Sequence, residues 1–198
     1  EGGILQTLSH AIPTSLQLVN AGDGMHAHPT QAMLDIMTIM EHKLKLRDIK
    51  IALVGNIRHS RVAQSLQRLC RVLEIGQLVL VGPDAWLPKD IIYGETTSSL
   101  QEGLKKADVV MTLRVQHERF VDDDDVCDLA TYRANYAITP RTIAYAKPNA
   151  LIMHPGPINR GVEIDSEVAD GPQSCILKQV QNGVFMRMAI LEHLIRTA

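Results

Sequence analysis

The chain has 198 residues, of which 45% are hydrophobic and 21% are charged, and its formal net charge is −2. That length is enough to bury a core, and the composition is too apolar for a disordered chain. The near-zero charge argues against a nucleic-acid-binding or membrane-surface protein, and no apolar run approaches the roughly 20 residues of a membrane span.

The predicted elements alternate between short strands and helices. In chain order they are a helix that contains Glu1, a strand at 16–20, a helix at 29–46, a strand at 49–55, a helix at 60–73, a strand at 77–82, a helix at 98–106, a strand at 108–113, a helix at 122–133, a short helix at 139–145, a strand at 150–154, a loop at 159–172 and a helix at 179–196. Several strand segments are rich in Val, Ile and Leu without polar alternation, which is typical of strands buried on both faces. The order predicts an α/β fold with a parallel β-sheet flanked by helices.

The three cysteines are widely separated and include no CxxC pair; they are Cys70, Cys127 and Cys175. This spacing fits neither a disulfide framework nor a zinc site of standard spacing. We therefore expect a reduced, cytoplasmic protein. No signal or transit peptide pattern is visible at the start of the sequence.

Polar side chains gather after four of the five predicted strands, where ligands bind in open α/β sheets. Arg61 and Arg114 follow different strands, and two guanidinium groups suit a ligand with two carboxylates, or with a carboxylate and a phosphate. His28 and Gln31 begin a helix, where backbone N–H groups favour an anion or a polarised carbonyl. These residues predict a cationic, amide-rich site at one edge of the sheet.

Other interpretations of single residues stay open at this point. Arg61 alone suits a surface ion pair. His26 and His28 suit a metal, although no third ligand is evident. Gly55 after a strand and Asp84 further on fit a dinucleotide-binding dehydrogenase, but no GxGxxG pattern follows Gly55. The coincidence of several polar groups at one edge favours a site over these alternatives.

Four groups of residues at the strand ends resemble the aspartate carbamoyltransferase (aspartate transcarbamylase) family. They are Asn-Ala-Gly-Asp-Gly at 20–24 with His-Pro-Thr-Gln at 28–31, the segment 54–62, Arg-Val-Gln-His-Glu-Arg at 114–119, and His-Pro-Gly-Pro-Ile-Asn-Arg-Gly at 154–161. The resemblance covers the whole chain in order and with the family's spacing. Pro155 stands where the related ornithine branch carries a cysteine, which favours the aspartate branch.

The resemblance implies the aspartate/ornithine carbamoyltransferase fold and an activity. The activity is transfer of the carbamoyl group from carbamoyl phosphate to the amine of L-aspartate, which gives N-carbamoyl-L-aspartate and phosphate in pyrimidine biosynthesis. The resemblance also implies that no metal or organic cofactor takes part. It implies a homotrimer, accompanied in some bacterial forms by regulatory or dihydroorotase-like chains.

The resemblance further assigns catalytic and binding roles to residues of this chain. His28 would hydrogen-bond the carbamoyl oxygen, and Gln31 would hold the carbamoyl NH2 group. Arg61 and Arg114 would bind the two aspartate carboxylates, and Gln116 would assist them. The backbone of three consecutive residues would contact the carbamoyl group and the substrate amine; these are Pro155, Gly156 and Pro157.

The family's phosphate-binding Ser-x-Arg-Thr loop has no counterpart in these 198 residues. We therefore expect residues 1–28 to be a remnant of the carbamoyl-phosphate-binding domain, 29–172 to be the aspartate-binding domain, and 173–198 to be a helix returning to the first domain. The chain alone, lacking the N-terminal domain, is then expected to show little or no turnover. The alternative is a non-catalytic regulatory or assembly module derived from this family.

Overall fold

A computed structural model describes residues 3–13, 15–115 and 128–197 of the chain. Within them lies a five-stranded sheet with the order β3-β2-β1-β4-β5. Every neighbouring pair of strands is parallel. The strands are β1 (Lys50–Val54), β2 (Gln77–Val81), β3 (Glu95–Thr97), β4 (Val109–Thr112) and β5 (Leu151–Met153).

The central strands are buried on both faces, as their apolar sequences predict. In β1, Ile51 and Leu53 belong to one buried cluster, and Ala52 and Val54 belong to the other. This alternation follows from the two-residue repeat of a strand. The sheet therefore has a packed layer on each side.

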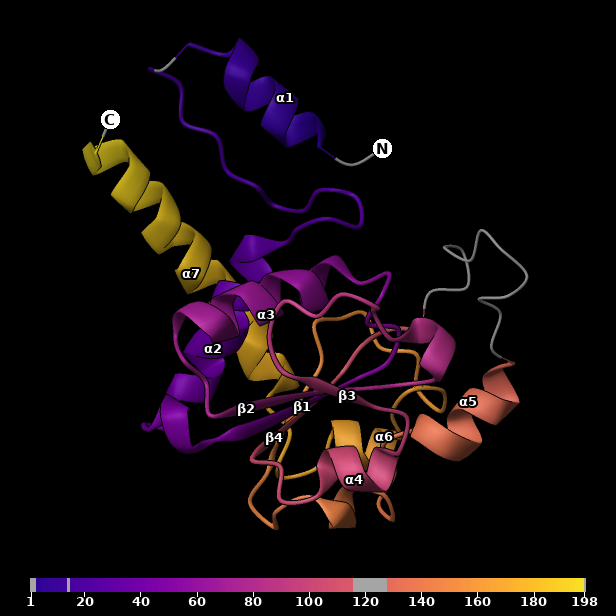
Figure 1. Cartoon of the computed structure of the whole chain (residues 1–198). Helices are drawn as coiled ribbons and strands as arrows, with labels where there is room; N and C mark the ends of the chain where they lie inside the picture. Colours follow the sequence, from indigo (N-terminus) through magenta and orange to yellow (C-terminus); the bar gives the residue numbers. More distant parts are fainter. Residues whose placement is uncertain (1–2, 14, 116–127, 198) are drawn as a thin grey trace.

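Helices make up the two outer layers, as Figure 1 shows. The α-helices of the described residues are α1 (Ile4–Ala11), α2 (Pro29–Met40), α3 (Arg61–Val72), α4 (Leu100–Leu104), α5 (Leu129–Tyr136), α6 (Ser166–Ala169) and α7 (Ile176–Thr197); of these, α1 lies outside the two layers. The helices α2 and α3 share a buried cluster with one face of the sheet, and α4, α5 and α6 share a cluster with the other face. The last helix, α7, packs against α2. The predicted fold class is confirmed.

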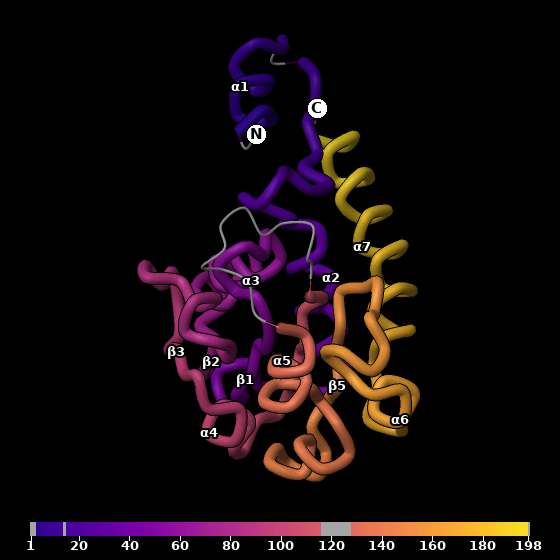
Figure 2. Tube along the Cα trace, turned by 90° about the vertical axis from the view of Figure 1, so that its right-hand side faces the viewer, coloured from indigo at the N-terminus to yellow at the C-terminus, as the bar shows by residue number. Residues whose placement is uncertain are grey.

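Two segments extend away from the sheet on the same side of the molecule (Figures 1 and 2). They are α1, which has no buried residue, and the C-terminal half of α7. Several large apolar side chains of α7 are more than half exposed, among them Val184 at 57%, Met188 at 60% and Ile195 at 77%. None of the described helices has both the length and the apolar character needed to cross a membrane.

One predicted strand is wrong and one real strand escapes prediction. Residues 16–20 form no strand, because their apolar side chains lie outside the sheet and no neighbouring strand pairs with them. The missing strand is β3, a three-residue edge strand that pairs with β2. Its sequence, Glu-Thr-Thr, is mostly exposed and carries no apolar run.

The longer predicted helices exist, but their ends move. The helix that begins at Pro29 ends at Met40 and not at residue 46, since residues 41–44 form a turn instead. The last helix begins at Ile176, three residues before the predicted start at 179. Ser60 caps α3 as expected, because its side-chain oxygen accepts a hydrogen bond from the Ala63 N–H at 3.1 Å.

Of three further predictions, one is tested only in part and two are corrected. Residues 122–127 of the helix predicted at 122–133 lie outside the described residues, and the helix that follows, α5, is capped by Asp128. The short helix predicted at 139–145 is only a 3₁₀ turn over Ile143–Tyr145. The loop predicted at 159–172 includes the four-residue helix α6.

Candidate active site

The strand order creates a binding position between β1 and β4. These strands are neighbours, but the chain continues from β1 to β2 on one side and from β4 to β5 on the other. Ligands of open α/β sheets bind at such a point, beyond the carboxyl ends of the strands. A cavity of about 260 Å³ lies there; its lining residues are His28, Gln31, Asn56, His59, Ser60, Arg61, Val62, Leu113, Arg114, Pro155, Gly156 and Pro157.

All predicted site residues within the described part of the chain line this one cavity. They come from the start of α2, from the segments after β1 and β4, and from the segment after β5. Gln116 lies outside the described residues. The prediction omitted five lining residues, which lie between β1 and the first turn of α3 or directly after β4: Asn56, His59, Ser60, Val62 and Leu113. Their place after a strand was the available signal.

The cavity is cationic. Arg61 and Arg114 both line it, and none of its lining residues within the described chain is an Asp or Glu. Across the described ranges, Arg61 makes no ion pair with a carboxylate. Two guanidinium groups from different strand ends therefore face a space that suits an anionic ligand.

The guanidinium of Arg61 lies directly over Gly22. A Cβ atom added at Gly22 would stand 2.8 Å from Nη1 of Arg61, and the φ of Gly22 is +134°, which side chains rarely adopt. The Gly22 N–H donates to Oδ1 of Asn20 at 2.9 Å, which closes the turn beneath the guanidinium. Gly22 is therefore required for the observed position of Arg61.

His28 lies at the N-terminus of α2, immediately before Pro29 at the first helical position. Its backbone N–H donates to Oγ of Ser65 at 2.8 Å, which joins the start of α2 to α3. Burial, together with the nearby charges of Arg61 and Arg187, lowers the pKa of His28 to about 4. The ring is therefore neutral near pH 7, and a neutral imidazole offers one N–H to an acceptor.

The segment after β5 is held by a buried histidine. The Gly156 N–H donates to Nδ1 of His154 at 2.8 Å, so Nε2 is the nitrogen that carries hydrogen. Nε2 lies 3.2 Å from Oε1 of Glu163, and the same oxygen accepts the Asn159 N–H at 2.5 Å. Both side chains of the His154–Glu163 pair are fully buried. These contacts determine the path of the backbone that lines the cavity at 155–157.

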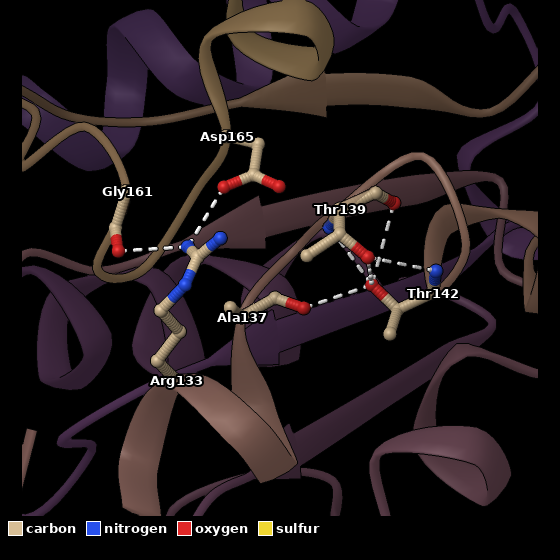
Figure 3. A network of polar contacts seen from close by, with 6 residues as sticks. All are labelled: Arg133, Ala137, Thr139, Thr142, Gly161 and Asp165. Carbon is tan, nitrogen blue, oxygen red and sulfur yellow. Dashed lines mark hydrogen bonds and ion pairs between the residues drawn. The ribbon is translucent and has the colours of Figure 1, made fainter. Parts of the chain in front are cut away.

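A second set of contacts, drawn in Figure 3, anchors the far end of that loop. Nη1 of Arg133 donates to the carbonyl of Gly161 and to Oδ1 of Asp165, both at 2.7 Å. Beside them, Oγ1 of Thr142 donates to the carbonyl of Ala137 at 2.8 Å. The Arg133 contacts therefore fasten the loop that carries Glu163 to α5, and the Ile138 N–H, which donates to the Glu163 carbonyl at 2.9 Å, joins it to the turn that follows α5.

No group of three or more His, Cys, Asp or Glu side chains within the described residues could hold a metal ion. The polar groups of the cavity are instead guanidinium, imidazole, amide and hydroxyl groups together with backbone. Such groups bind anions and polarise carbonyls.

Comparison with known proteins identifies the family. The model of the "Aspartate/ornithine carbamoyltransferase, Asp/Orn binding domain" family matches residues 47–194. The chain belongs to the aspartate/ornithine carbamoyltransferase family. The match includes every strand of the sheet.

Among individual carbamoyltransferases, an aspartate carbamoyltransferase catalytic subunit of Legionella pneumophila (strain Paris) is 56% identical over 195 residues, which cover 98% of this chain and 65% of the relative. An aspartate transcarbamoylase structure from Trypanosoma cruzi, in complex with carbamoyl aspartate and phosphate, is 33% identical with a TM-score of 0.75, covering 87% of this chain and 57% of that one.

An ornithine carbamoyltransferase structure from Gloeobacter violaceus is 25% identical with a TM-score of 0.80, covering 96% of this chain and 65% of that one. The chain spans 65% of the length of the Legionella subunit. The sequence is closer to the aspartate relatives than to this ornithine relative, although the fold matches both.

Proposed function

We propose that this chain is part of an enzyme that transfers a carbamoyl group from carbamoyl phosphate to the amine of L-aspartate. The observation that carries the proposal is the cavity itself, in which two guanidinium groups, a neutral imidazole and an amide converge among described lining residues that include no acid. The 56% identity to an aspartate carbamoyltransferase catalytic subunit supports the choice of substrate class.

Arg61 and Arg114 are the proposed ligands of the two carboxylates of L-aspartate, because each guanidinium can bind a carboxylate through two N–H groups. Gln116 is proposed to assist them. The same pair disfavours ornithine, whose two amines would bring positive charge toward two guanidinium groups. This arrangement accounts for selection of aspartate over the other amino acid used in the family.

In the proposed reaction the aspartate amine attacks the carbamoyl carbon. A C–N bond forms, the C–O bond to phosphate breaks, and the proton released by the amine is taken up by the departing phosphate. Negative charge develops on the carbonyl oxygen during the attack, and an N–H of neutral His28 can stabilise it by hydrogen bonding. His28 therefore acts as a hydrogen-bond donor and does not need to act as a base.

Positioning supplies much of the remaining rate enhancement, because two bound substrates react as if at very high concentration. Gln31 is proposed to accept a hydrogen bond from the carbamoyl NH2 group. The backbone at Pro155, Gly156 and Pro157 is proposed to contact the carbamoyl group and the incoming amine.

We also propose the domain division and the setting of the enzyme. Residues 29–172 would form the aspartate-binding domain, residues 1–28 would belong to the carbamoyl-phosphate domain, and the helix over 173–198 would pack on that domain. The half-exposed apolar side chains of α7 support this division. A cytoplasmic homotrimer is the proposed assembly.

The proposal is tested with Arg61→Leu and Arg114→Leu in the protein of natural length that carries these residues. Each variant should lower kcat/KM for L-aspartate at least about tenfold, since a hydrogen bond to a charged group contributes roughly 1.5–3 kcal/mol. Arg47→Leu is the matched control, because Arg47 pairs with Glu74 on the exposed surface and lies outside the cavity. Unchanged kcat/KM in both cavity variants would contradict the proposed role.

A further inference from the structure

A buried carboxyl group lies beneath the cavity and does not line it. Asp35 is fully buried on α2, one turn beyond Gln31. Its Oδ1 accepts two hydrogen bonds from side-chain amides, from Nε2 of Gln31 at 2.9 Å and from Nε2 of Gln179 at 2.8 Å. Its Oδ2 has no hydrogen-bond partner within the described residues. A buried carboxyl group is costly, so its position between two amides calls for a function.

The first amide belongs to the cavity. Gln31 is itself largely buried, at 7% exposure, and it is one of the lining residues. Oδ1 of Asp35 accepts this hydrogen bond whether or not Oδ2 carries a proton, so the nitrogen of the Gln31 amide faces Asp35. The amide oxygen, Oε1, is then the atom that a molecule in the cavity can meet. A group that donates a hydrogen bond, such as an NH2 group, fits that oxygen.

The second amide contacts the segment after β5, whose residues 155–157 also line the cavity. Gln179 of α7 turns its nitrogen to Asp35, and its Oε1 accepts the backbone N–H of His154 at 2.9 Å. His154 ends β5 and begins the segment whose residues 155–157 line the cavity. Asp35 is therefore linked to both walls, directly through Gln31 and indirectly through Gln179.

We propose that Asp35 is a positioning residue that orients the Gln31 amide, with its oxygen toward the carbamoyl NH2 group, and that ties this amide to the backbone wall at 155–157. The inference rests on the proposed function and deepens it, since it explains why the donor substrate is recognised as a carbamoyl group. Reversal of the Gln31 amide would present an N–H to the substrate N–H, and two donors cannot pair.

The inference predicts a particular pattern of kinetic effects. Asp35→Leu removes the acceptor of both amides, so kcat/KM for carbamoyl phosphate should fall at least about tenfold, while the KM for L-aspartate should change less than about threefold. Asp35→Asn retains a side-chain oxygen for both amides and should restore most of the activity. A general loss of structure would instead affect both substrates and would not be relieved by Asn.

A matched control lies one turn further along the same helix. Oγ1 of Thr38 is buried and accepts from Nδ2 of Asn182 at 3.0 Å, so Thr38→Val also removes a polar contact between α2 and α7. It touches neither Gln31 nor the segment after β5. We expect Thr38→Val to keep both kinetic parameters near those of the wild type.

A multiple-variant comparison covers the case in which Asp35→Leu does not fold. Gln31→Met/Gln179→Met is compared with Gln31→Met/Gln179→Met/Asp35→Leu, in which no amide at position 31 or 179 is left without an acceptor. If Asp35 acts through Gln31 and Gln179, the added Asp35→Leu substitution should lower kcat/KM for carbamoyl phosphate by less than about threefold in this background.

All assays use the protein of natural length, and wild-type formation of N-carbamoyl-L-aspartate is measured first. Its absence would overturn the proposed function. If the wild type is active but Asp35→Leu resembles Thr38→Val, or if Asp35→Leu lowers kcat/KM a further tenfold in the Gln31→Met/Gln179→Met background, the inference about Asp35 is overturned and the proposed function stands.

Discussion

The burial of Asp35 predicts an unusual dependence of stability on pH. Burial raises the pKa of this carboxyl group from 3.8 to about 7, and the hydrogen bonds from Gln179 and Gln31 oppose the rise only in part. Between about pH 4 and pH 7 the folded protein therefore keeps a proton on Asp35 that the unfolded chain has lost. Asp35 therefore contributes to the stability of the folded protein at low pH, where its buried carboxyl group is uncharged. This stabilising contribution is lost as the pH rises through about 7.

The size of the effect follows from the shift. Each pKa unit corresponds to about 1.4 kcal/mol, so the rise of the Asp35 pKa from 3.8 to about 7 lowers the free energy of unfolding by about 4 kcal/mol between pH 4 and pH 8. Asp35→Asn removes the titration and leaves an oxygen for both amides. Relative to the wild type, the Asn variant should gain about 4 kcal/mol in its free energy of unfolding over that range.

The assay is urea-induced unfolding followed by circular dichroism at several pH values between 4 and 8.5. His28 also titrates, with a pKa lowered to about 4, but it does so in both proteins and cancels in the difference. Cys70, the titratable neighbour on α3, has a pKa raised to about 12, chiefly by burial and also by the charge of Asp35. Its thiol stays neutral throughout the range.

Thr38→Val is again the control, and the difference between its free energy of unfolding and that of the wild type should not vary with pH. If the free energies of unfolding of Asp35→Asn and the wild type differ by the same amount from pH 4 to pH 8, Asp35 does not titrate in the folded protein as described. A wild type that gains stability relative to the Asn variant as the pH rises would refute this titration more strongly.

Two further predictions concern the cavity walls. Gly22→Ala should displace the guanidinium of Arg61 and raise the KM for L-aspartate about tenfold. The control is Gly161→Ala, which is also at positive φ but has open space around it and should leave the KM unchanged. Equal KM values in the two variants would show that a side chain at position 22 does not displace Arg61. Ring ¹⁵N chemical shifts of His28 should show titration near pH 4 and a neutral ring at pH 6, and a midpoint near 6.5 would mean that burial and Arg61 do not act on it as described.

The sequence predicts those parts of the site that depend on local order. Ser60 caps a helix through contacts three residues away, and residues that follow parallel strands meet at one edge of a sheet, so Arg61 and Arg114 could be expected to face one space. The edge strand β3 escapes prediction because it is short, polar and largely exposed. Periodicity does not reveal such a strand.

The contacts beneath the cavity depend on tertiary packing. Asp35 and Gln179 are 144 positions apart and meet only because α7 packs against α2. In the sequence Asp35 interrupts an apolar helix face, and nothing nearby shows which groups satisfy it. The apolar segment at 16–20 misleads for the same reason, since burial in a sheet requires a partner strand that only the folded chain can supply.

Identification of the product tests the central claim most directly. The protein of natural length is incubated with ¹³C-labelled carbamoyl phosphate and either L-aspartate or L-ornithine, and the products are identified by NMR. The account predicts labelled N-carbamoyl-L-aspartate with aspartate, and no carbamoyl-ornithine above the rate without enzyme. Formation of carbamoyl-ornithine in preference, or of neither product by a folded protein, would contradict it.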